Sequence, residues 1–262
     1  MSSLALIVAG FSVGLTVGLT GVGGGSLMTP ILIFFFGIKP YLAVGTDLLF
    51  AAFTKAGGTL NLARRRLVPW RVVTLLTAGS LPAAAVTLWV LHRLGPASAT
   101  VQSLMTRGLG LALILTAAAM LFKAMRGHSH RPPAAATVSD ACRPRHVALP
   151  VLFGAVIGGL VTLTSVGAGA IGVSVLLLLF PLLPLPRIVA ADIAYAVPLT
   201  LVAGLGHASL GSVDWSLLGL LLAGSLPGIW LGSRLVQHTP ERLVRSLLSV
   251  MLAYAGTRLI AL

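Results

Sequence analysis

The sequence predicts an all-α integral membrane protein made of two inverted repeats, each a broken, re-entrant helical hairpin followed by three transmembrane helices. Three features predict this fold: the apolar composition, long apolar runs separated by short basic loops, and landmarks that recur in the second half. Of the 262 residues, 57% are hydrophobic and 9% are charged, whereas a soluble domain carries about 25% charged residues. The length suits one membrane unit and leaves no room for a soluble domain.

Ten apolar runs divide the chain, and each predicts a helix: residues 3–19, 27–36, 41–62, 72–91, 104–122, 147–163, 171–183, 188–206, 215–235 and 243–262. Most approach the roughly 20 residues that a helix needs to cross a bilayer. The second and seventh runs are shorter, and at 1.5 Å per residue they would reach only about 15 to 20 Å. We expect these two runs to be the returning arms of helical hairpins, with a short core helix as the alternative.

A glycine-rich stretch precedes each short run. The first is Thr-Gly-Val-Gly-Gly-Gly-Ser at 20–26, and the second is Thr-Ser-Val-Gly-Ala-Gly-Ala at 164–170. Each glycine costs a helix roughly 1 kcal/mol relative to alanine, and backbone released from a helix within hydrocarbon must bond inside the protein or line a wet cavity. We therefore predict a helix break near the membrane midplane in each half, where transporters hold their substrates.

The second half repeats landmarks of the first half at a constant offset of 145 residues, and the glycine-rich stretches follow at an offset of 144. Such agreement in register predicts a duplication. A Gly-Ser-Leu-Pro tetrapeptide occurs at 79–82 and again at 224–227. In the same way Trp70 recurs as Trp215, and Asp47 recurs as Asp192.

The predicted repeats at 1–122 and 147–262 are joined by a linker at 123–146. A hairpin adds no net crossing, so each half crosses three times and the second half is inverted relative to the first. Cytoplasmic loops are rich in Lys and Arg. With the loop at 64–66 in the cytoplasm, thirteen of the 18 basic residues are cytoplasmic, four lie on the other face and Lys55 stays within a span. We therefore expect a multi-pass protein of the cell inner membrane, with a cytoplasmic linker and both termini in the periplasm.

The two breaks also predict an anion site. A helix that begins at mid-membrane directs N–H groups and the positive end of its dipole toward the break, and two such helices related by inversion would face one cavity. Lys55, near the middle of a span, would compensate the charge of an anion, with snorkelling to an interface as the alternative. Tight packing of small residues is the alternative for the glycines. The candidate substrate-binding residues are Thr20, Gly21, Gly23, Gly24, Gly25, Ser26, Lys55, Thr164, Ser165, Gly167 and Gly169.

Other side chains have expected roles inside or at the ends of spans. Asp47 and Asp192 lie one to two turns into spans at equivalent positions. They are candidates for proton coupling, and structural hydrogen bonding is an equal alternative. His207, at the end of a span, is expected at the membrane interface rather than as a ligand, and Trp70 and Trp215 are expected as interface anchors.

The sequence argues against an enzyme, a metal site and a bound cofactor. It contains no convincing Ser, His and Asp set within the membrane, no His-Glu-x-x-His and no Cys/His cluster, and Cys142 is its single cysteine. The glycine-rich stretches lack the Lys-Ser/Thr of a P-loop and the third glycine of the dinucleotide fingerprint. The basic residues behind the net charge of +13 lie in short loops, which favours a topology signal over nucleic-acid binding.

Four motifs occur in order along the chain. They are Leu-Thr-Gly-Val-Gly-Gly-Gly-Ser at 19–26 followed by Leu-Met-Thr-Pro, Ala-Val-Gly-Thr-Asp-Leu at 43–48, Val-Pro-Trp at 68–70 after an Arg-rich loop, and His-Ala-Ser-Leu-Gly-Ser-Val-Asp-Trp at 207–215. Together they resemble the sulfite exporter TauE/SafE family over nearly the whole chain. Lys55, Asp47 and the diluted second glycine stretch depart from the family pattern, and these departures concern the substrate rather than the fold.

The resemblance implies a transporter of sulfite, a sulfonate or a related organosulfur anion, often in the outward direction, which agrees with the anion site expected at the helix breaks. We expect alternating access between the two halves, with a coupled proton if the direction is uptake. The expected partners are a small anionic substrate, a proton, membrane lipid and, as one option, a second copy in a homo-oligomer. The alternatives are an anion channel, a transporter of a non-sulfur solute, and a structural subunit that binds no small ligand.

Overall fold

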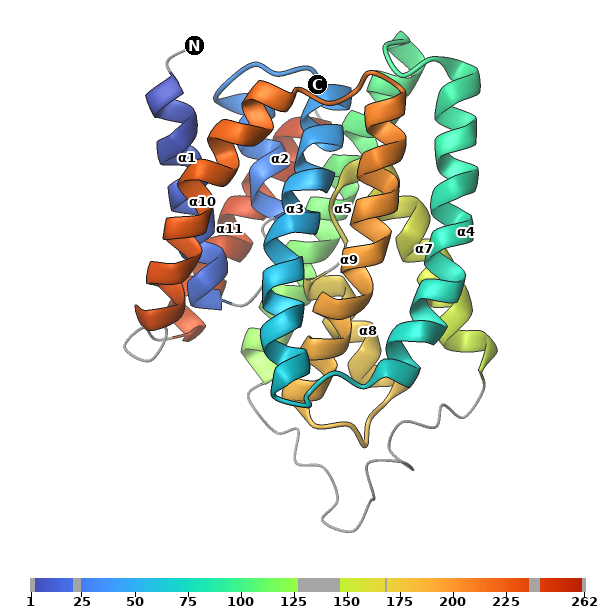
Figure 1. The fold of residues 1–262 in the computed structure, drawn as a ribbon, viewed down its shortest axis with the longest axis vertical. Helices are drawn as coiled ribbons and strands as arrows, with labels where there is room; N and C mark the ends of the chain where they lie inside the picture. Colours follow the sequence, from blue (N-terminus) through green and yellow to red (C-terminus); the bar gives the residue numbers. More distant parts are fainter. Residues whose placement is uncertain (1–2, 21–24, 127–146, 168, 236–240, 261–262) are drawn as a thin grey trace.

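The computed structural model describes residues 3–20, 25–126, 147–167, 169–235 and 241–260. Within these ranges the chain forms ten α-helices and no β-strand, which confirms the all-α prediction. The helices, drawn in Figure 1, are α1 (Ser3–Thr20), α2 (Gly25–Phe34), α3 (Pro40–Arg64), α4 (Trp70–Leu94), α5 (Ala99–Arg126), α7 (Ala148–Thr164), α8 (Ala170–Leu179), α9 (Leu185–Ser209), α10 (Trp215–Leu235) and α11 (Glu241–Ile260).

Four helices in the described part of the chain, α4, α5, α9 and α10, are long and apolar enough to cross a membrane. They support the prediction of a membrane-embedded protein. α3 is as long as α4, but Asp47 and Lys55 make it more polar. α1 and α7 have 18 and 17 residues, slightly fewer than the roughly 20 that cross a full bilayer.

The two short helices, α2 and α8, have ten residues each. Each is therefore about 15 Å long, half the thickness of the hydrocarbon core of a bilayer. α8 ends at Leu179, four residues before the end of the predicted run at 183. Pro181 and Pro184 explain the early end, because proline lacks the N–H that a helix needs and also disfavours the helical conformation of the residue before it.

Each half packs one of its helices on the other half: α1 contacts α10, and α7 contacts α4. A Cβ atom placed on Gly10 would lie 2.5 Å from the Leu221 carbonyl oxygen, and one on Gly154 would lie 2.3 Å from the Leu76 carbonyl oxygen. Real Cβ atoms do not approach so closely, so both crossings require glycine. The two glycines are 144 residues apart and the two leucines 145 apart, and the crossings therefore correspond between the halves.

The facing side of each crossing shows the same correspondence. A Cβ atom on Gly79 of α4 would lie 1.9 Å from the Val151 carbonyl oxygen, and one on Gly224 of α10 would lie 2.0 Å from the Ile7 carbonyl oxygen. Gly79 and Gly224 open the two copies of the Gly-Ser-Leu-Pro tetrapeptide. The recurring tetrapeptide therefore marks a place where the backbones of two helices from different halves approach each other closely.

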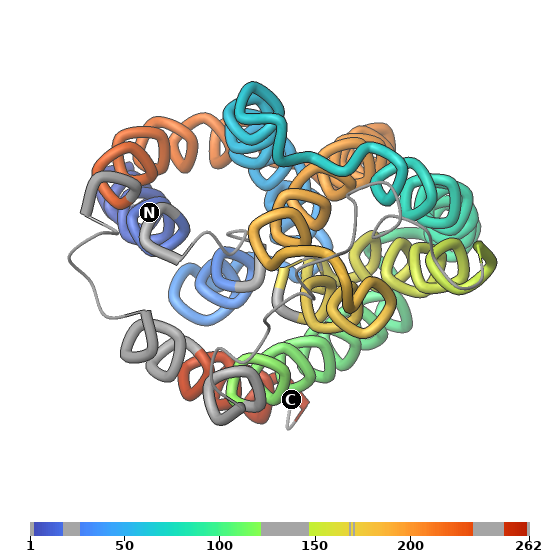
Figure 2. The backbone as a smooth tube through the Cα atoms, turned by 90° about the horizontal axis from the view of Figure 1, so that it is seen from below, coloured from blue at the N-terminus to red at the C-terminus, as the bar shows by residue number. Residues whose placement is uncertain are grey.

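The remaining long helices pair with their counterparts. α3 packs on α9, and α5 packs on α11; the second pair lies side by side in Figure 2. The short helices lie against the helices that follow them, α2 on α3 and α8 on α9. Asp47 and Lys55 of α3 and Asp192 of α9 are buried in this arrangement.

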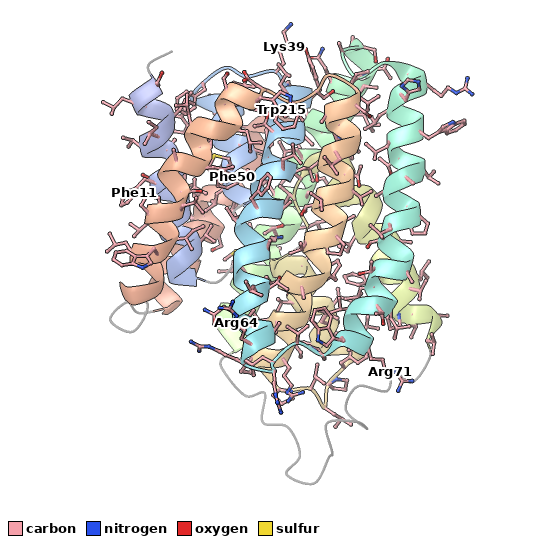
Figure 3. The ribbon with its side chains drawn as sticks, in the orientation of Figure 1. Phe11, Lys39, Phe50, Arg64, Arg71 and Trp215 are labelled. Carbon is pink, nitrogen blue, oxygen red and sulfur yellow. The ribbon has the colours of Figure 1, made fainter. Side chains whose placement is uncertain are left out.

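The described helices place both ends of the chain on one side of the bundle. α1 begins and α11 ends at the upper end in Figure 1, whereas α5 ends and α7 begins at the lower end. Figure 3 shows Lys39 and Trp215 at the upper end and Arg64 and Arg71 at the lower end. This arrangement agrees with the expected topology, and the orientation in a membrane stays a prediction.

The close crossing of α1 and α10 can be tested by adding one methyl group. In Gly224→Ala the methyl group would meet the backbone of α1, and we expect the protein to lose roughly 1–3 kcal/mol of stability. Gly219→Ala on the same helix is the matched control, because nothing lies within 4 Å of its Cβ position. Thermal unfolding of the full-length protein in detergent measures both variants. An unchanged midpoint for Gly224→Ala would contradict the crossing.

Candidate functional site

The second glycine-rich stretch breaks the helix, as the sequence predicts. α7 ends at Thr164, Ser165 adopts a left-handed φ of 60°, and α8 begins at Ala170. Gly167 and Gly169 have φ values of 132° and 130°, a region that glycine enters readily and other residues rarely. The two glycines therefore make the sharp change of direction between α7 and α8.

The hydroxyl groups at this break differ in their use. Thr164 Oγ1 donates to the Leu160 carbonyl at 2.7 Å and accepts from the Val166 N–H at 3.2 Å. Ser165 is 6% exposed, and its hydroxyl has no hydrogen-bond partner of good geometry among the described residues. Thr164 thus holds the end of α7 together, whereas the Ser165 hydroxyl makes no such bond to the backbone.

Most of the first break lies outside the described residues. α1 ends at Thr20, and Gly25 is the first residue of α2. The side chains of Thr20 and Ser26 lie outside the description as well. The substrate-binding roles assigned to this break stay predictions: Thr20, Gly21, Gly23, Gly24, Gly25 and Ser26.

Asp47 lies in α3 and has no exposed surface. The Thr29 hydroxyl of α2 donates a hydrogen bond to Asp47 Oδ2, so the short and long helices of the first half meet at this carboxyl group. Ser165, from the break in the second half, also interacts with it, although Asp47 Oδ1 has no partner of good geometry in the described ranges. One buried acid is therefore contacted from both halves.

Asp192 occupies the equivalent place in α9 and is 3% exposed. It lies against α8, because a Cβ atom on Gly172 would be 1.9 Å from Asp192 Oδ1. Gly172 belongs to the first turn of α8, where the positive end of the helix dipole favours a carboxylate. Each aspartate thus faces the short helix of its own half.

Lys55 lies in α3, eight residues after Asp47, and is 7% exposed. Its ammonium group interacts electrostatically with Asp192 and, more weakly, with Asp47. Burial between two acids argues against snorkelling to an interface. Asp47, Lys55 and Asp192 are termed the α3–α9 charge cluster below; the structure brings together one base and two acids from the two halves.

The prediction that His207 is an interfacial residue is wrong. His207 has no exposed surface, and its Nε2 lies 2.9 Å from the Thr162 carbonyl oxygen of α7. The end of an apolar run gives no sign of whether another helix covers it, which is why the sequence misled. Trp70 and Trp215, the first residues of α4 and α10, are 58% and 62% exposed, which suits interface anchors.

The turn between α9 and α10 is fixed on α3 near the upper end of the bundle. The Asp214 N–H donates to the Thr46 hydroxyl at 3.0 Å. Asp214 Oδ1 accepts from the Ser216 hydroxyl at 2.6 Å and from the Leu217 N–H at 3.0 Å. These hydrogen bonds hold the pKa of Asp214 below its ordinary value. The motif at 207–215 therefore acts in packing and capping at this end.

Sequence reasoning missed two residues of this region, Thr29 and Tyr195. Tyr195 is fully buried, and its hydroxyl oxygen lies 3.4 Å from the Cβ position of Gly172. Its spacing of three residues after Asp192 places both on one face of a helix, and that signal was readable. Thr29 gave no signal, because only the contact between α2 and α3 shows its partner.

The chemistry of the cluster suits a small charged solute or a proton. Over the described ranges, no group of three or more His, Cys, Asp and Glu side chains could hold a metal ion. Two acids and one base inside helices are costly in a membrane and mark substrate or ion pathways. The cluster is therefore a candidate functional site.

The model of the family described as sulfite exporter TauE/SafE matches residues 6–259. The chain belongs to this family. This TauE/SafE chain is 34% identical over 258 residues to Probable membrane transporter protein YjnA of Bacillus subtilis (strain 168), covering 98% of this chain and 100% of YjnA. Probable membrane transporter protein YunE of the same organism is 27% identical over 252 residues, 90% of this chain and 87% of YunE. Probable membrane transporter protein YdhB, also from that organism, is 23% identical over 261 residues, 98% of this chain and 100% of YdhB.

No solved structure matches this TauE/SafE chain. The family and the relatives make it a membrane transporter, and α4, α5, α9 and α10 are its candidate spans among the described helices.

The bond between α2 and Asp47 is open to a direct test. Thr29→Val keeps the shape of the side chain but leaves a buried carboxyl group without its donor, and we expect a loss of roughly 1–3 kcal/mol in stability. Thr116→Val is the matched control, because Thr116 is 3% exposed and its hydroxyl bonds only its own helix, at the Ala112 carbonyl at 2.7 Å. Thermal unfolding in detergent compares the two. Equal shifts would argue against a special role for the Thr29 hydroxyl.

Proposed function

We propose that this TauE/SafE protein is a secondary transporter that moves sulfite, a sulfonate or a related organosulfur anion across the bacterial inner membrane, with export as the favoured direction. The observation that carries the proposal is the α3–α9 charge cluster, buried between helices and next to the start of α8. Ionisable side chains inside membrane helices are costly and mark substrate or ion pathways. The family description supplies the substrate class.

Two features of the cluster support an anionic substrate. Lys55 supplies a positive charge within α3 and interacts with Asp192, which lies against the first turn of α8. The first N–H groups of a helix and the positive end of its dipole favour negative charge. Ser165, Gly167 and Gly169 lie in the break that leads into α8. We propose that the substrate binds between this break and Lys55, with the first break contributing from the other half.

Alternating access is supported by the correspondence between the halves. α1 crosses α10, and α7 crosses α4. The residues in contact at one crossing lie 144 or 145 positions from the corresponding residues at the other crossing. Inverted repeats at 1–122 and 147–262 would produce such a correspondence. Inverted repeats can exchange conformations, so that a site near the midplane opens to one side and then to the other. The cytoplasmic linker at 123–146 and the periplasmic termini belong to this proposal, as does the re-entrant nature of α2 and α8.

The membrane potential favours export of an anion. An inside-negative potential helps to expel a monovalent anion by about 2.3 kcal/mol per 100 mV, so export needs no coupled ion. Uptake would need one, and Asp47 and Asp192 are the residues proposed to carry a proton. Because Asp192 lies at the first turn of α8, its carboxylate and a bound anion would repel each other unless a proton is present.

One observation favours a second candidate function, transport of a solute other than a sulfur anion. The cluster holds two acids for one lysine, an excess of negative charge that would suit a zwitterion or a cation. A binding screen with both kinds of solute separates the two candidates.

The anion site is tested by calorimetric titration of the purified full-length protein in detergent. Sulfite, sulfate, thiosulfate, sulfoacetate, taurine and carboxylate controls would be compared. We expect one sulfur oxyanion or sulfonate to bind selectively, and Lys55→Ala to bind it at least about tenfold more weakly, because a hydrogen bond to a charged group contributes about 1.5–3 kcal/mol.

Lys39→Ala is the control for that titration, because Lys39 is exposed at the upper end of the bundle. Equal affinity in Lys55→Ala and wild type would remove Lys55 from the site. Binding of a cation or a zwitterion, with no anion bound, would contradict the anion proposal.

Proton coupling is tested in proteoliposomes by transport of the selected anion with and without a pH gradient. We expect Asp192→Asn to lose the response to the gradient, because asparagine cannot take up and release a proton, while exchange of anion across the membrane continues. Asp214→Asn is the control, since Asp214 is exposed and lies between α9 and α10. If Asp47→Asn and Asp192→Asn both keep the wild-type response, neither acid is the coupling residue.

A further inference from the structure

Tyr195 is a buried polar residue that the proposed transport site does not yet include. It lies in α9, one helical turn after Asp192, and has no exposed surface. Its hydroxyl oxygen is 3.4 Å from the position that a Cβ atom on Gly172 would take, so it faces the first turn of α8. Within the described part of the chain, this hydroxyl has no hydrogen-bond partner.

A buried hydroxyl without a partner calls for an explanation. Buried tyrosine usually bonds through its hydroxyl, and a buried donor left unpaired destabilises the protein. Phenylalanine would fill the same space without that cost. A solute bound at the first turn of α8 would accept a hydrogen bond from Tyr195, and that use explains why the position holds tyrosine.

The corresponding residue in the first half is Phe50. Phe50 and Tyr195 are 145 residues apart and follow Asp47 and Asp192 by three residues each. Both aromatic rings are fully buried. The two halves therefore place the same kind of ring beside an acid, but only the half that contains α8 adds a hydroxyl.

The basic residue of the cluster is also present in only one half. The residue 145 positions after Lys55 is Thr200, and its hydroxyl is already used, since it donates to a backbone carbonyl of its own helix at 2.7 Å. Lys55 interacts more strongly with Asp192 than with Asp47. A charged donor and a neutral donor therefore gather near Asp192 and the start of α8.

The first half lacks the hydroxyl of Tyr195. There Phe50 takes the place of Tyr195 and offers no donor. The two halves therefore have corresponding backbones but different side chains at these positions.

We infer that Tyr195 donates a hydrogen bond to the transported oxyanion, and that one anion is held on the α8 side by Tyr195, Lys55 and the first turn of α8. The inference rests on the proposed function and deepens it. Tyr195 lies in α9 and Lys55 in α3, and the several acceptor oxygens of a sulfite or sulfonate group would let one anion bond to both. A single anion, rather than a symmetric pair, is bound by each chain.

The experiment compares wild type, Tyr195→Phe and Tyr254→Phe as full-length proteins in detergent. Sulfite, or the anion that binds best in the screen above, is titrated by calorimetry. We expect one anion per chain and an affinity at least about tenfold lower in Tyr195→Phe. Tyr254→Phe should match wild type, because Tyr254 is 65% exposed on α11.

Thermal unfolding of the ligand-free proteins separates binding from stability. Because Tyr195→Phe removes a hydroxyl that has no partner, its midpoint should equal or exceed that of wild type. A lower midpoint together with unchanged anion affinity would assign the hydroxyl to stability and overturn the inference. Two anions per chain would overturn the one-sided site.

The inference and the proposed function fail in different ways. If Tyr195→Phe binds the anion as tightly as wild type while Lys55→Ala binds it weakly, the inference is overturned and the proposed function stands. If wild type binds none of the anions, both are overturned.

Discussion

The burial of Lys55 together with two acids that interact with it is the constraint on which the rest of the structure depends. A charge inside a membrane protein must be matched by an opposite charge and shielded from lipid. The two acids come from different halves, so the match requires α3 to pack on α9. α2 and α8 then cover the acids, through the Thr29 hydroxyl in one half and through Gly172 in the other.

The interaction among these three charged groups also makes each of them sensitive to the charge state of the others. With one base and two acids, a change at any member alters the electrostatic balance of the others. An anion that approaches Lys55 adds a negative charge, and a proton on Asp192 or Asp47 restores the balance. Solute and proton would therefore act on one network that both halves share, which is the kind of link an alternating-access cycle needs.

The sequence predicted the order of the helices and the position of the second break, because apolar length and runs of glycine are local signals. The helix crossings correspond between the halves at offsets of 144 and 145 residues, the same offsets that relate the sequence landmarks. Local chemistry shifted one boundary, since Pro181 ends α8 early. The burial of His207 and the roles of Thr29 and Tyr195 depend on which helix lies opposite each residue. That information is absent from hydrophobic periodicity, so pattern alone could not supply it.

The crossed packing of α1 on α10 and α7 on α4 has a consequence for biosynthesis. The face of α1 that carries Gly10 meets Leu221, which leaves the ribosome 211 residues later. At about 5–20 residues per second, α1 waits on the order of 10–40 s for its partner. During that interval lipid or the insertion machinery must cover a smooth, glycine-lined surface. The first half is therefore not a finished unit when its own last helix is made, because the helices that pack on α1 and α4 belong to the second half.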